Sequence, residues 1–324
     1  MTADRRPLDA TAFALMTLLC FLWGVQQVVV KLTAPYVSLL AQGGIRSVLA
    51  CVLVLAWARA RGIPLFGRDG TLIPGVVAGV LFGIEFVFIY AGLGYTDASR
   101  LVVFLYLTPP LTALGLAFLI PGERLGARQW LGVLVAFIGI ALAFSEGFVA
   151  PRPSTWRGDL LAVLAAVCWA ATTLVVRATA LARASATKTL FYQLAIGLAL
   201  LFAASLAAGE PGVLALTPFV LASIAYQGAI VAFASFLVWF WLLGRYLAGR
   251  LAVLSFLTPL FGVLAGVAVL DEPFTPLFAL AAALVGAGIV LVNLPPRAAV
   301  AGAAGAAEAA AAPEGASAAG EARP

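Results

Sequence analysis

The stretch from Arg100 to Leu125 reads RLVVFLYLTPPLTALGLAFLIPGERL, and a similar stretch, RLAVLSFLTPLFGVLAGVAVLDEPF, runs from Arg250 to Phe274. Each is an apolar run of about 20 residues, long enough to cross the roughly 30 Å hydrocarbon core of a bilayer as a helix. Each also carries a proline near its middle. The matched positions are Arg100 with Arg250, Thr108 with Thr258, Pro109 with Pro259 and, after one residue of slippage, Glu123 with Glu272.

The prolines have a predictable effect on the backbone. Pro109 and Pro259 each remove an N–H group, which leaves the carbonyls of Leu105 and Ser255 without an intrahelical donor. In lipid such a carbonyl must be satisfied by a neighbouring helix, a side chain or a cavity. Each Thr-Pro step is therefore either a cavity edge or an ordinary proline kink packed against a neighbour. Because the step is repeated, we interpret Pro109, Pro110 and Pro259 as kink or gating positions.

The composition places the chain in a membrane. Of the 324 residues, 64% are hydrophobic and 10% are charged, and the mean hydropathy is +1.10. Soluble domains carry about a quarter charged residues, which excludes an ordinary water-soluble fold. The net charge of +5 comes from basic residues scattered between apolar runs. It forms no basic stripe with interleaved aromatics, so no nucleic-acid partner is predicted.

Several catalytic classes are excluded by what the sequence lacks. It has no histidine, which excludes HExxH zinc sites and Ser-His-Asp triads. The three cysteines lie in separate apolar runs, so neither a metal cluster nor a disulfide framework is predicted. No phosphate-binding loop of the GxxxxGK[ST] form occurs. We therefore expect no enzymatic activity, no metal and no cofactor.

Ten apolar runs of spanning length follow the polar N-terminus. The first resembles a signal peptide, but at about 20 residues it is longer than an h-region and no cleavage site follows, so we expect it to be retained. The runs cover residues 11–30, 36–58, 72–93, 99–119, 127–145, 158–178, 187–208, 218–243, 251–270 and 277–294.

Lysine and arginine predict the orientation. With a cytoplasmic N-terminus, 14 of these residues fall in cytoplasmic segments and four, Lys31, Arg100, Arg152 and Arg157, fall in external ones. We expect a multi-pass protein of a bacterial cytoplasmic (inner) membrane with both termini cytoplasmic. The predicted parts are a cytoplasmic N-terminus (1–10), a first five-helix repeat (11–145), a connecting loop (146–157), a second five-helix repeat (158–295) and a disordered cytoplasmic tail (296–324).

The duplication extends beyond the two quoted stretches. Five spans are an odd number, so the second copy must enter the membrane from the opposite side to the first. The predicted fold class is an all-α polytopic membrane protein of ten transmembrane helices in two five-helix inverted-topology repeats, an architecture typical of secondary transporters. Low-complexity membrane composition is the alternative, and the matched positions argue against it. In the first run Trp23, Gln26, Gln27 and Lys31 correspond to Trp169, Thr172, Thr173 and Arg177 in the sixth.

These features resemble the EamA-like group of the drug/metabolite transporter superfamily. Within it the chain is most similar to bacterial exporters of aromatic amino acids. The resemblance covers residues 11–295 and implies a basket of helices around a central cavity, with peripheral fifth and tenth helices and alternating access. It rests on Phe21-Leu22-Trp23-Gly24, on Leu107-Thr108-Pro109 followed by Gly122-Glu123, and on Leu257-Thr258-Pro259 followed by Asp271-Glu272-Pro273.

Two charged residues, Arg46 and Glu85, stand near the centres of the second and third runs. Facing lipid, each would cost about 2.5 to 3.5 kcal/mol, so we expect both to face the interior. They either form a structural ion pair or act on substrate, with Arg46 receiving a carboxylate and Glu85 balancing it or carrying a coupling proton. Their repeat counterparts, Tyr192 and approximately Ser235, are uncharged, which keeps the second alternative open.

The substrate is expected in a mostly apolar pocket with few polar groups. Buried amides such as Gln26, Gln42 and Gln227 are expected to hydrogen-bond between helices. The candidate binding residues are Trp23, Gln27, Arg46, Glu85, Tyr90, Tyr106, Trp169, Tyr192, Gln193 and Tyr226.

Repeated glycines predict close helix packing. Gly75, Gly79 and Gly83 form consecutive GxxxG steps in the third run, and Gly262 with Gly266 forms one in the ninth. Such small residues let helices approach closely in a membrane.

The sequence therefore predicts a secondary transporter in the lipid bilayer, a monomeric exporter of small metabolites, in particular of aromatic or other bulky apolar amino acids. The alternative is a carrier for another class, such as nucleotide-sugars, phosphates or drug-like cations. A carrier for phosphates should hold several cations in its cavity, whereas Arg46 is the only clearly deep one here.

Overall fold

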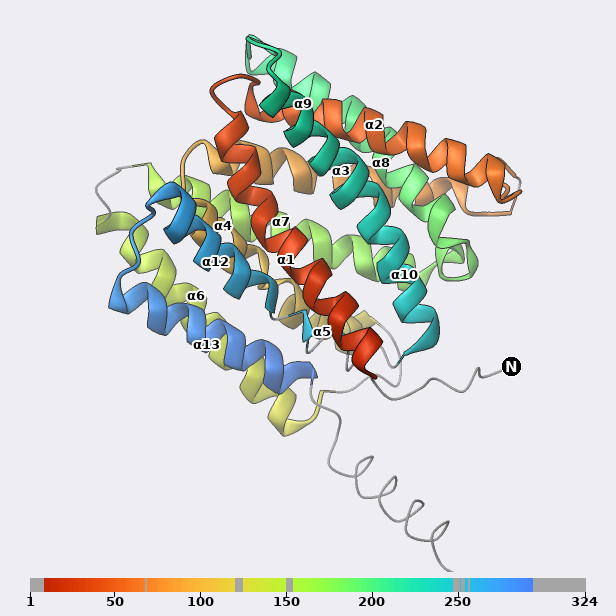
Figure 1. Ribbon diagram of the computed structural model, residues 1–324. Helices are drawn as coiled ribbons and strands as arrows, with labels where there is room; N and C mark the ends of the chain where they lie inside the picture. The colour runs from red at the N-terminus through yellow and green to blue at the C-terminus, as the bar shows by residue number, and fades with distance from the viewer. Residues whose placement is uncertain are drawn as a thin grey trace, which may run out of the picture. The chain divides into compact units, whose positions relative to one another are not determined.

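A computed structural model gives the fold, and it describes residues 9–67, 69–119, 125–149, 154–246, 251, 254–255 and 257–293 (Figure 1). Regular structure in these residues is helical, apart from an isolated antiparallel bridge between Val37 and Val213. The predicted all-α class is confirmed. Most of the predicted N-terminal segment and the whole predicted tail lie outside the described residues, as do Gly122, Glu123 and Arg250 of the repeated stretches.

The helices follow the predicted apolar runs closely. Those of the first half are α1 (Ala10–Thr33), α2 (Leu39–Ala60), α3 (Leu72–Leu93), α4 (Ala98–Leu105), α5 (Thr108–Leu119) and α6 (Ala127–Val149). Those of the second half are α7 (Thr155–Ala178), the 3₁₀-helix η1 (Ala180–Arg183), α8 (Ala186–Ala207), α9 (Pro218–Ala225), the π-helix η2 (Tyr226–Ser235), α10 (Phe236–Arg245), α12 (Leu257–Leu270) and α13 (Pro276–Asn293).

Most of these segments are long and apolar enough to cross a bilayer. Within the described residues there are eight such segments, with α4 and α5 forming one and α9, η2 and α10 forming another. α12 and α13 are apolar but shorter. One boundary differs from the prediction: α6 continues to Val149 and α7 begins at Thr155, so helix occupies much of the predicted connecting loop 146–157.

The first Thr-Pro step separates two helices where the sequence predicted a kink within one helix. α4 ends at Leu105 and α5 begins at Thr108, so Pro109 lies in a first helical turn, where its missing N–H is not required. The hydroxyl of Thr108 donates to the carbonyl oxygen of Leu105 at 2.7 Å and to that of Ala166 in α7 at 3.3 Å. The predicted need for a partner at Leu105 is confirmed, and a side chain supplies it.

The predicted glycine seams are also confirmed where helices cross. A Cβ on Gly79 would lie 2.7 Å from the carbonyl oxygen of Tyr192 in α8, and a Cβ on Gly262 would lie 3.2 Å from that of Gly24 in α1. A seam that the sequence analysis did not single out joins α6 to α13, which lie side by side in Figure 1. There a Cβ on Gly132 would lie 2.8 Å from the carbonyl oxygen of Gly288. Closely approaching backbones thus hold these helices together.

α1 ends and α7 begins at the same end of the helices. Lys31, in the last turn of α1, lies 3.6 Å from the carboxylate of Asp97. Next to Asp97, the hydroxyl of Thr96 donates at 2.7 Å to Asp159, which lies near the start of α7. α1 and α7 therefore run in opposite senses. We call this end of the helices the Arg100 end and the opposite one the Asp69 end.

Candidate functional site

A chain of amide and hydroxyl groups connects three helices in the interior. The Tyr90 hydroxyl of α3 donates to Gln227 Oε1 of η2 at 3.0 Å, and Gln227 Nε2 donates to Gln42 Oε1 of α2 at 3.2 Å. Gln42 Nε2 in turn donates to the carbonyl oxygens of Val37 at 2.8 Å and Val30 at 3.3 Å. We call Tyr90, Gln227 and Gln42 the amide chain. The predicted hydrogen-bonding role is thereby confirmed for Gln42 and Gln227.

Gln26 and Arg46 lie one helical turn from the amide chain, at the same depth. Gln26 precedes Val30 by four residues on α1, and Arg46 follows Gln42 by four residues on α2. α1 and α2 are joined by a short connection and run antiparallel. A step of four residues toward the N-terminus of α1 and a step of four residues toward the C-terminus of α2 therefore both lead toward the Asp69 end. Both side chains therefore approach the interior on the Asp69 side of the amide chain.

Arg46 rests on an aromatic face of α3. Its Cζ lies 4.1 Å from the ring centroid of Phe86 and 5.7 Å from that of Tyr90, distances at which a cation is attracted by the ring. Phe86 and Tyr90 are one turn apart, so they present one continuous surface. Glu85 precedes Phe86 on the same helix and is 4% exposed, while Arg46 is 2% exposed.

Three polar atoms in this layer are buried and have no hydrogen-bond partner: Gln26 Oε1, Arg46 Nε and Glu85 Oε2. We call Gln26, Arg46 and Glu85 the charged layer. Of the two alternatives left open for Arg46 and Glu85, the structural ion pair is not formed, because none of the ion pairs among the described residues joins these two side chains. A buried group left unsatisfied costs about 1–3 kcal/mol, and more when charged, so a polar ligand or water that bonded to these atoms would be bound favourably.

The aromatic candidates of the α1 face are engaged with the second half. Trp23 Nε1 donates to Ser235 Oγ at 2.8 Å, and the Trp23 ring meets Trp239 edge-on at 5.8 Å between centroids. The Tyr226 hydroxyl donates to the carbonyl oxygen of Leu22 at 2.6 Å. Trp23 and Tyr226 thus join α1 to η2 and α10.

Tyr106 and Trp169 form a second aromatic contact. Their rings meet edge-on with centroids 6.1 Å apart and an interplanar angle of 87°. Tyr106 lies in the break between α4 and α5 and is 4% exposed. Gln27, another candidate, is buried on α1 beside Gln26.

Tyr192 does not lie with the charged layer, and Gln193 is the next residue of α8. The Tyr192 ring covers Gly75 near the start of α3, and its hydroxyl lies 3.4 Å from that of Thr71. Gly75 precedes Glu85 by ten residues, about 15 Å along a helix. Although Tyr192 is the sequence counterpart of Arg46, its side chain points to the Asp69 end.

Two features of the site were missed by the sequence analysis. Phe86 supplies the surface under Arg46, and its spacing of four residues from Tyr90 could have been noticed. The π-helix η2, which contains Gln227, has no sequence signal that we recognise. π-helical segments are rare and are found frequently at functional sites.

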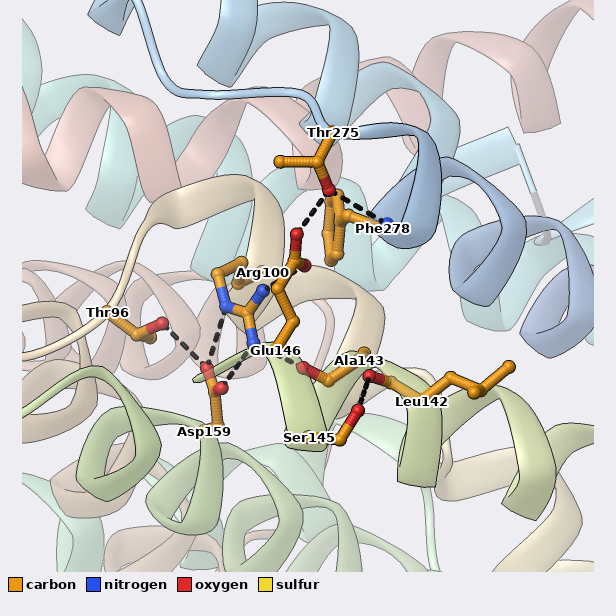
Figure 2. Close-up of polar contacts among 9 residues, drawn as sticks. All are labelled: Thr96, Arg100, Leu142, Ala143, Ser145, Glu146, Asp159, Thr275 and Phe278. Carbon is orange, nitrogen blue, oxygen red and sulfur yellow. Dashed lines mark hydrogen bonds and ion pairs between the residues drawn. The ribbon is translucent and has the colours of Figure 1, made fainter. Parts of the chain in front are cut away.

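A second polar cluster ties four helices together at the Arg100 end. Figure 2 shows the Arg100 guanidinium between two carboxylates. Nη2 donates to Asp159 Oδ2 at 2.6 Å, Nε donates to Asp159 Oδ1 at 3.3 Å, and Nη1 donates to Glu146 Oε2 at 2.9 Å. Glu146 also accepts from the hydroxyl of Thr275, which precedes α13. The sequence indicated Arg100 only as an external charge, whereas it is 6% exposed and fully engaged.

Glu272 joins α1 and α12 to the start of α4 beside this cluster. Its carboxylate accepts from the backbone N–H groups of Ala98 at 2.6 Å and Ser99 at 2.8 Å, and it lies 3.4 Å from Lys31 Nζ. A carboxylate at a helix N-terminus satisfies free N–H groups and the helix dipole. Next to it a cavity of about 340 Å³ is lined by Lys31, Ala34, Leu39, Leu93, Gly94, Asp97, Leu270 and Glu272.

Acidic side chains outside the spans are paired at the Asp69 end. Lys188 Nζ donates to Asp69 Oδ2 at 2.7 Å, and this bond together with that from Thr71 holds the pKa of Asp69 well below its ordinary value of 3.8. Asp9 caps α1 by accepting from the Ala12 N–H at 2.7 Å and accepts from Tyr246 at 2.8 Å. These bonds also lower the Asp9 pKa.

Curated relatives of this chain are transporters or uncharacterised proteins. An uncharacterized transporter, YvbV, of Bacillus subtilis is 27% identical over 283 residues, which cover 86% of this chain and 90% of that protein. A probable amino-acid metabolite efflux pump of Escherichia coli is 24% identical over 287 residues, covering 86% and 93%. A protein of the same description from Salmonella typhimurium is 23% identical over 284 residues.

A solved crystal structure has the same fold, with a TM-score of 0.60, 23% sequence identity and coverage of 88% of this chain and 98% of its own. The model of the EamA-like transporter family matches twice, over residues 10–145 and again over residues 156–294. These two matches cover nearly all of the helical part and divide it where α6 gives way to α7. The chain therefore belongs to the EamA-like transporter family of the drug/metabolite transporter superfamily.

Proposed function

We propose that the chain is a secondary carrier that exports small metabolites, in particular amino acids with aromatic or other bulky apolar side chains. In this proposal ten spans form two five-helix repeats of inverted topology, and the substrate site alternates between the two faces of a bacterial cytoplasmic membrane. The two matches to the family and the opposite senses of α1 and α7 support the inverted repeat. The relatives described as amino-acid metabolite efflux pumps support the substrate class.

The proposal assigns the Asp69 end to the cytoplasm. Cytoplasmic segments carry an excess of lysine and arginine. Among the described residues, those near the Arg100 end are Lys31, Arg100 and Arg157, whereas those near the Asp69 end are Arg59, Arg61, Arg128, Arg177, Arg183, Lys188 and Arg245. This imbalance favours cytoplasmic termini.

The charged layer is the observation that carries the proposal. A permanent guanidinium and a carboxylate are buried in the middle of α2 and α3, each with an atom that has no partner. Charged side chains within membrane spans are costly and mark substrate or ion pathways. A carrier for nucleotide-sugars or phosphates would need several cations here, and the layer has Arg46 alone among the described residues.

Counterflow in proteoliposomes tests the function. Vesicles containing the purified protein and preloaded with unlabelled phenylalanine should accumulate labelled phenylalanine transiently, and protein-free vesicles should not. Preloading with phosphate, a nucleotide-sugar or an organic cation should give no accumulation of the matching labelled compound. Exchange of one of these in place of phenylalanine would refute the amino-acid assignment and leave the carrier in place.

A further inference from the structure

We infer that the charged layer is a head-group site for a zwitterionic α-amino acid, in which Arg46 binds the carboxylate and Glu85 binds the ammonium group. This inference rests on the proposed function and adds to it the chemical groups that a substrate must carry and the residues that read them. Gln26 lies at the same depth on α1 and has a buried oxygen without a partner, and we assign it to the site as a hydrogen-bond acceptor.

The charges themselves define the ligand. Arg46 and Glu85 come from neighbouring helices and are 2% and 4% exposed, and Arg46 lies on the ring of Phe86, the residue next to Glu85, without forming an ion pair with Glu85. A structural ion pair in a membrane would be in direct contact, because a buried charge without a partner is strongly unfavourable. A ligand with one negative and one positive group would satisfy both side chains at once.

The unpartnered atoms indicate where the ligand would bind. The Glu85 oxygen and the Gln26 carbonyl oxygen are both acceptors, which suits an ammonium group with three donors. Arg46 Nε is a donor, which suits a carboxylate oxygen. The Phe86 ring lies under the guanidinium, 4.1 Å from Arg46 Cζ, and offers it no hydrogen-bond acceptor, so the Nε donor remains for a ligand.

The amide chain holds this layer in register. Gln42 and Tyr90, one turn from Arg46 and Phe86, are tied to each other through Gln227. Their side chains are therefore already satisfied, so that they orient α2, α3 and η2 without competing for the ligand. A Cβ on Gly228, next to Gln227, would lie 3.0 Å from the Arg46 carbonyl oxygen, so η2 also supports the backbone at Arg46.

The second half shows that the fold does not require these charges. Ser235, the counterpart of Glu85, accepts a hydrogen bond from Trp23 and is satisfied inside the protein. Tyr192, the counterpart of Arg46, packs on Gly75 at the Asp69 end. The charges of the first half are thus additions to the repeated scaffold, and the head group of the substrate would bind to the first half alone.

Competition by phenylalanine analogues tests the inference. The analogue 3-phenylpropionate lacks the ammonium group, and phenethylamine lacks the carboxylate. For the wild-type carrier, each should compete with labelled phenylalanine at least about tenfold less well than unlabelled phenylalanine does. A tenfold loss corresponds to one hydrogen bond to a charged group. Glu85→Gln should abolish most of the difference between phenylalanine and 3-phenylpropionate. Arg46→Met should do the same for phenethylamine. Tyr192→Phe, which alters a ring remote from the layer, should keep the wild-type order.

The outcomes separate the inference from the proposed function. If the wild-type protein exchanges no amino acid, the proposed function is wrong and the inference with it. If it exchanges phenylalanine but Glu85→Gln and Arg46→Met preserve both tenfold differences, the head-group site is wrong while the amino-acid carrier stands. Size-exclusion profiles establish folding of each variant, and Arg46→Lys replaces Arg46→Met if the latter aggregates. Arg46→Lys retains the positive charge, so it should keep much of the preference for phenylalanine over phenethylamine. Glu85→Gln removes the negative charge, so it should keep less of the preference for phenylalanine over 3-phenylpropionate.

Discussion

Replacing Asp159 by asparagine should loosen the Arg100 end of the protein more than any other single-atom change in that cluster. The Asp159 carboxylate is 0% exposed and accepts from Thr96 at 2.7 Å and from two nitrogens of Arg100 at 2.6 and 3.3 Å. Asparagine has the same shape and can still accept from Thr96. It turns one of its donors or its neutral oxygen toward the guanidinium, so the ion pair is lost while the packing is kept.

The expected loss in the free energy of unfolding depends on how deeply the ion pair is buried and on which partners Arg100 retains. Breaking a fully buried ion pair costs about 3–5 kcal/mol because one charge is left unpaired. Here Arg100 retains Glu146 at 2.9 Å and the Ala143 carbonyl oxygen at 2.6 Å. Polar contacts between membrane helices also contribute less than in water-soluble cores, on average about 0.6 kcal/mol. We therefore expect a loss of about 2–3 kcal/mol in the free energy of unfolding for Asp159→Asn.

Glu146→Gln is the matched control for this change. It removes the same charge from the same arginine, but the Glu146 side chain is 14% exposed, and solvent can screen what it leaves behind. Its loss should be about 1 kcal/mol or less, as for partly exposed pairs. Arg100→Met alone and combined with Asp159→Asn completes a double-mutant cycle, which isolates the pair from the loss of packing.

Unfolding in mixed micelles by increasing sodium dodecyl sulfate, followed by tryptophan fluorescence, gives the free energy of unfolding of the wild type, the three single variants and the double variant. The prediction requires Asp159→Asn to be the more destabilised of the two carboxylate variants and to show a favourable coupling to Arg100. A larger effect of Glu146→Gln, or additive losses in the cycle, would refute the assignment of Asp159 as the principal partner.

Three further predictions concern other parts of the structure. Thr108→Val removes the hydroxyl partner of a backbone carbonyl and should cost about 1–2 kcal/mol in the same unfolding assay, whereas Thr258→Val, at the repeated position, should cost less because that hydroxyl donates to no backbone carbonyl oxygen. Equal losses for both would contradict this account. Gly132→Ala forces a Cβ to within 2.8 Å of the α13 backbone and should cost about 1–3 kcal/mol, while Gly126→Ala, whose Cβ would meet only a flexible side chain at 3.9 Å, should leave the unfolding midpoint unchanged. Asp69→Asn should lower the thermal midpoint slightly at pH 7; because the Asp69 pKa is depressed in the folded protein, the difference from wild type should persist at pH 5 and disappear only at pH values below the ordinary aspartate range. A difference that vanishes between pH 7 and pH 5 would show that Asp69 is not paired in solution.

Hydropathy and repetition predicted most of the scaffold, because both depend on properties carried by every residue of a span. Every predicted run contains helix in the described residues, and the glycine steps predicted α3 packing against a neighbour without naming it. The unsatisfied carbonyl of Leu105 was predictable because proline always removes the same donor. Its partner, the hydroxyl of Thr108, is only three residues away and could have been named as well.

Interactions between distant residues were not predictable from one sequence. Arg100 and Asp159 are 59 positions apart in the chain, with α5 and α6 between them, and nothing in either local sequence identifies the other as its partner. Arg46 and Glu85 were placed at similar depth correctly, but depth does not fix rotation about a helix axis. That rotation is why Arg46 lies on Phe86 instead of against Glu85.

For the same reason, residues at equivalent positions of the two repeats make different interactions. Thr108 is engaged by two carbonyl oxygens and Thr258 by none; Ser235 is bonded to Trp23, while an oxygen of its counterpart Glu85 is unpartnered. Two halves with identical side chains around a two-fold axis could present only a symmetric site, whereas an amino acid has different groups at its two ends. A carrier built from a duplicated unit must therefore break the symmetry of its interior side chains before it can hold such a ligand in one orientation, and in the proposed site Arg46 and Glu85, whose counterparts Tyr192 and Ser235 are uncharged, supply that break.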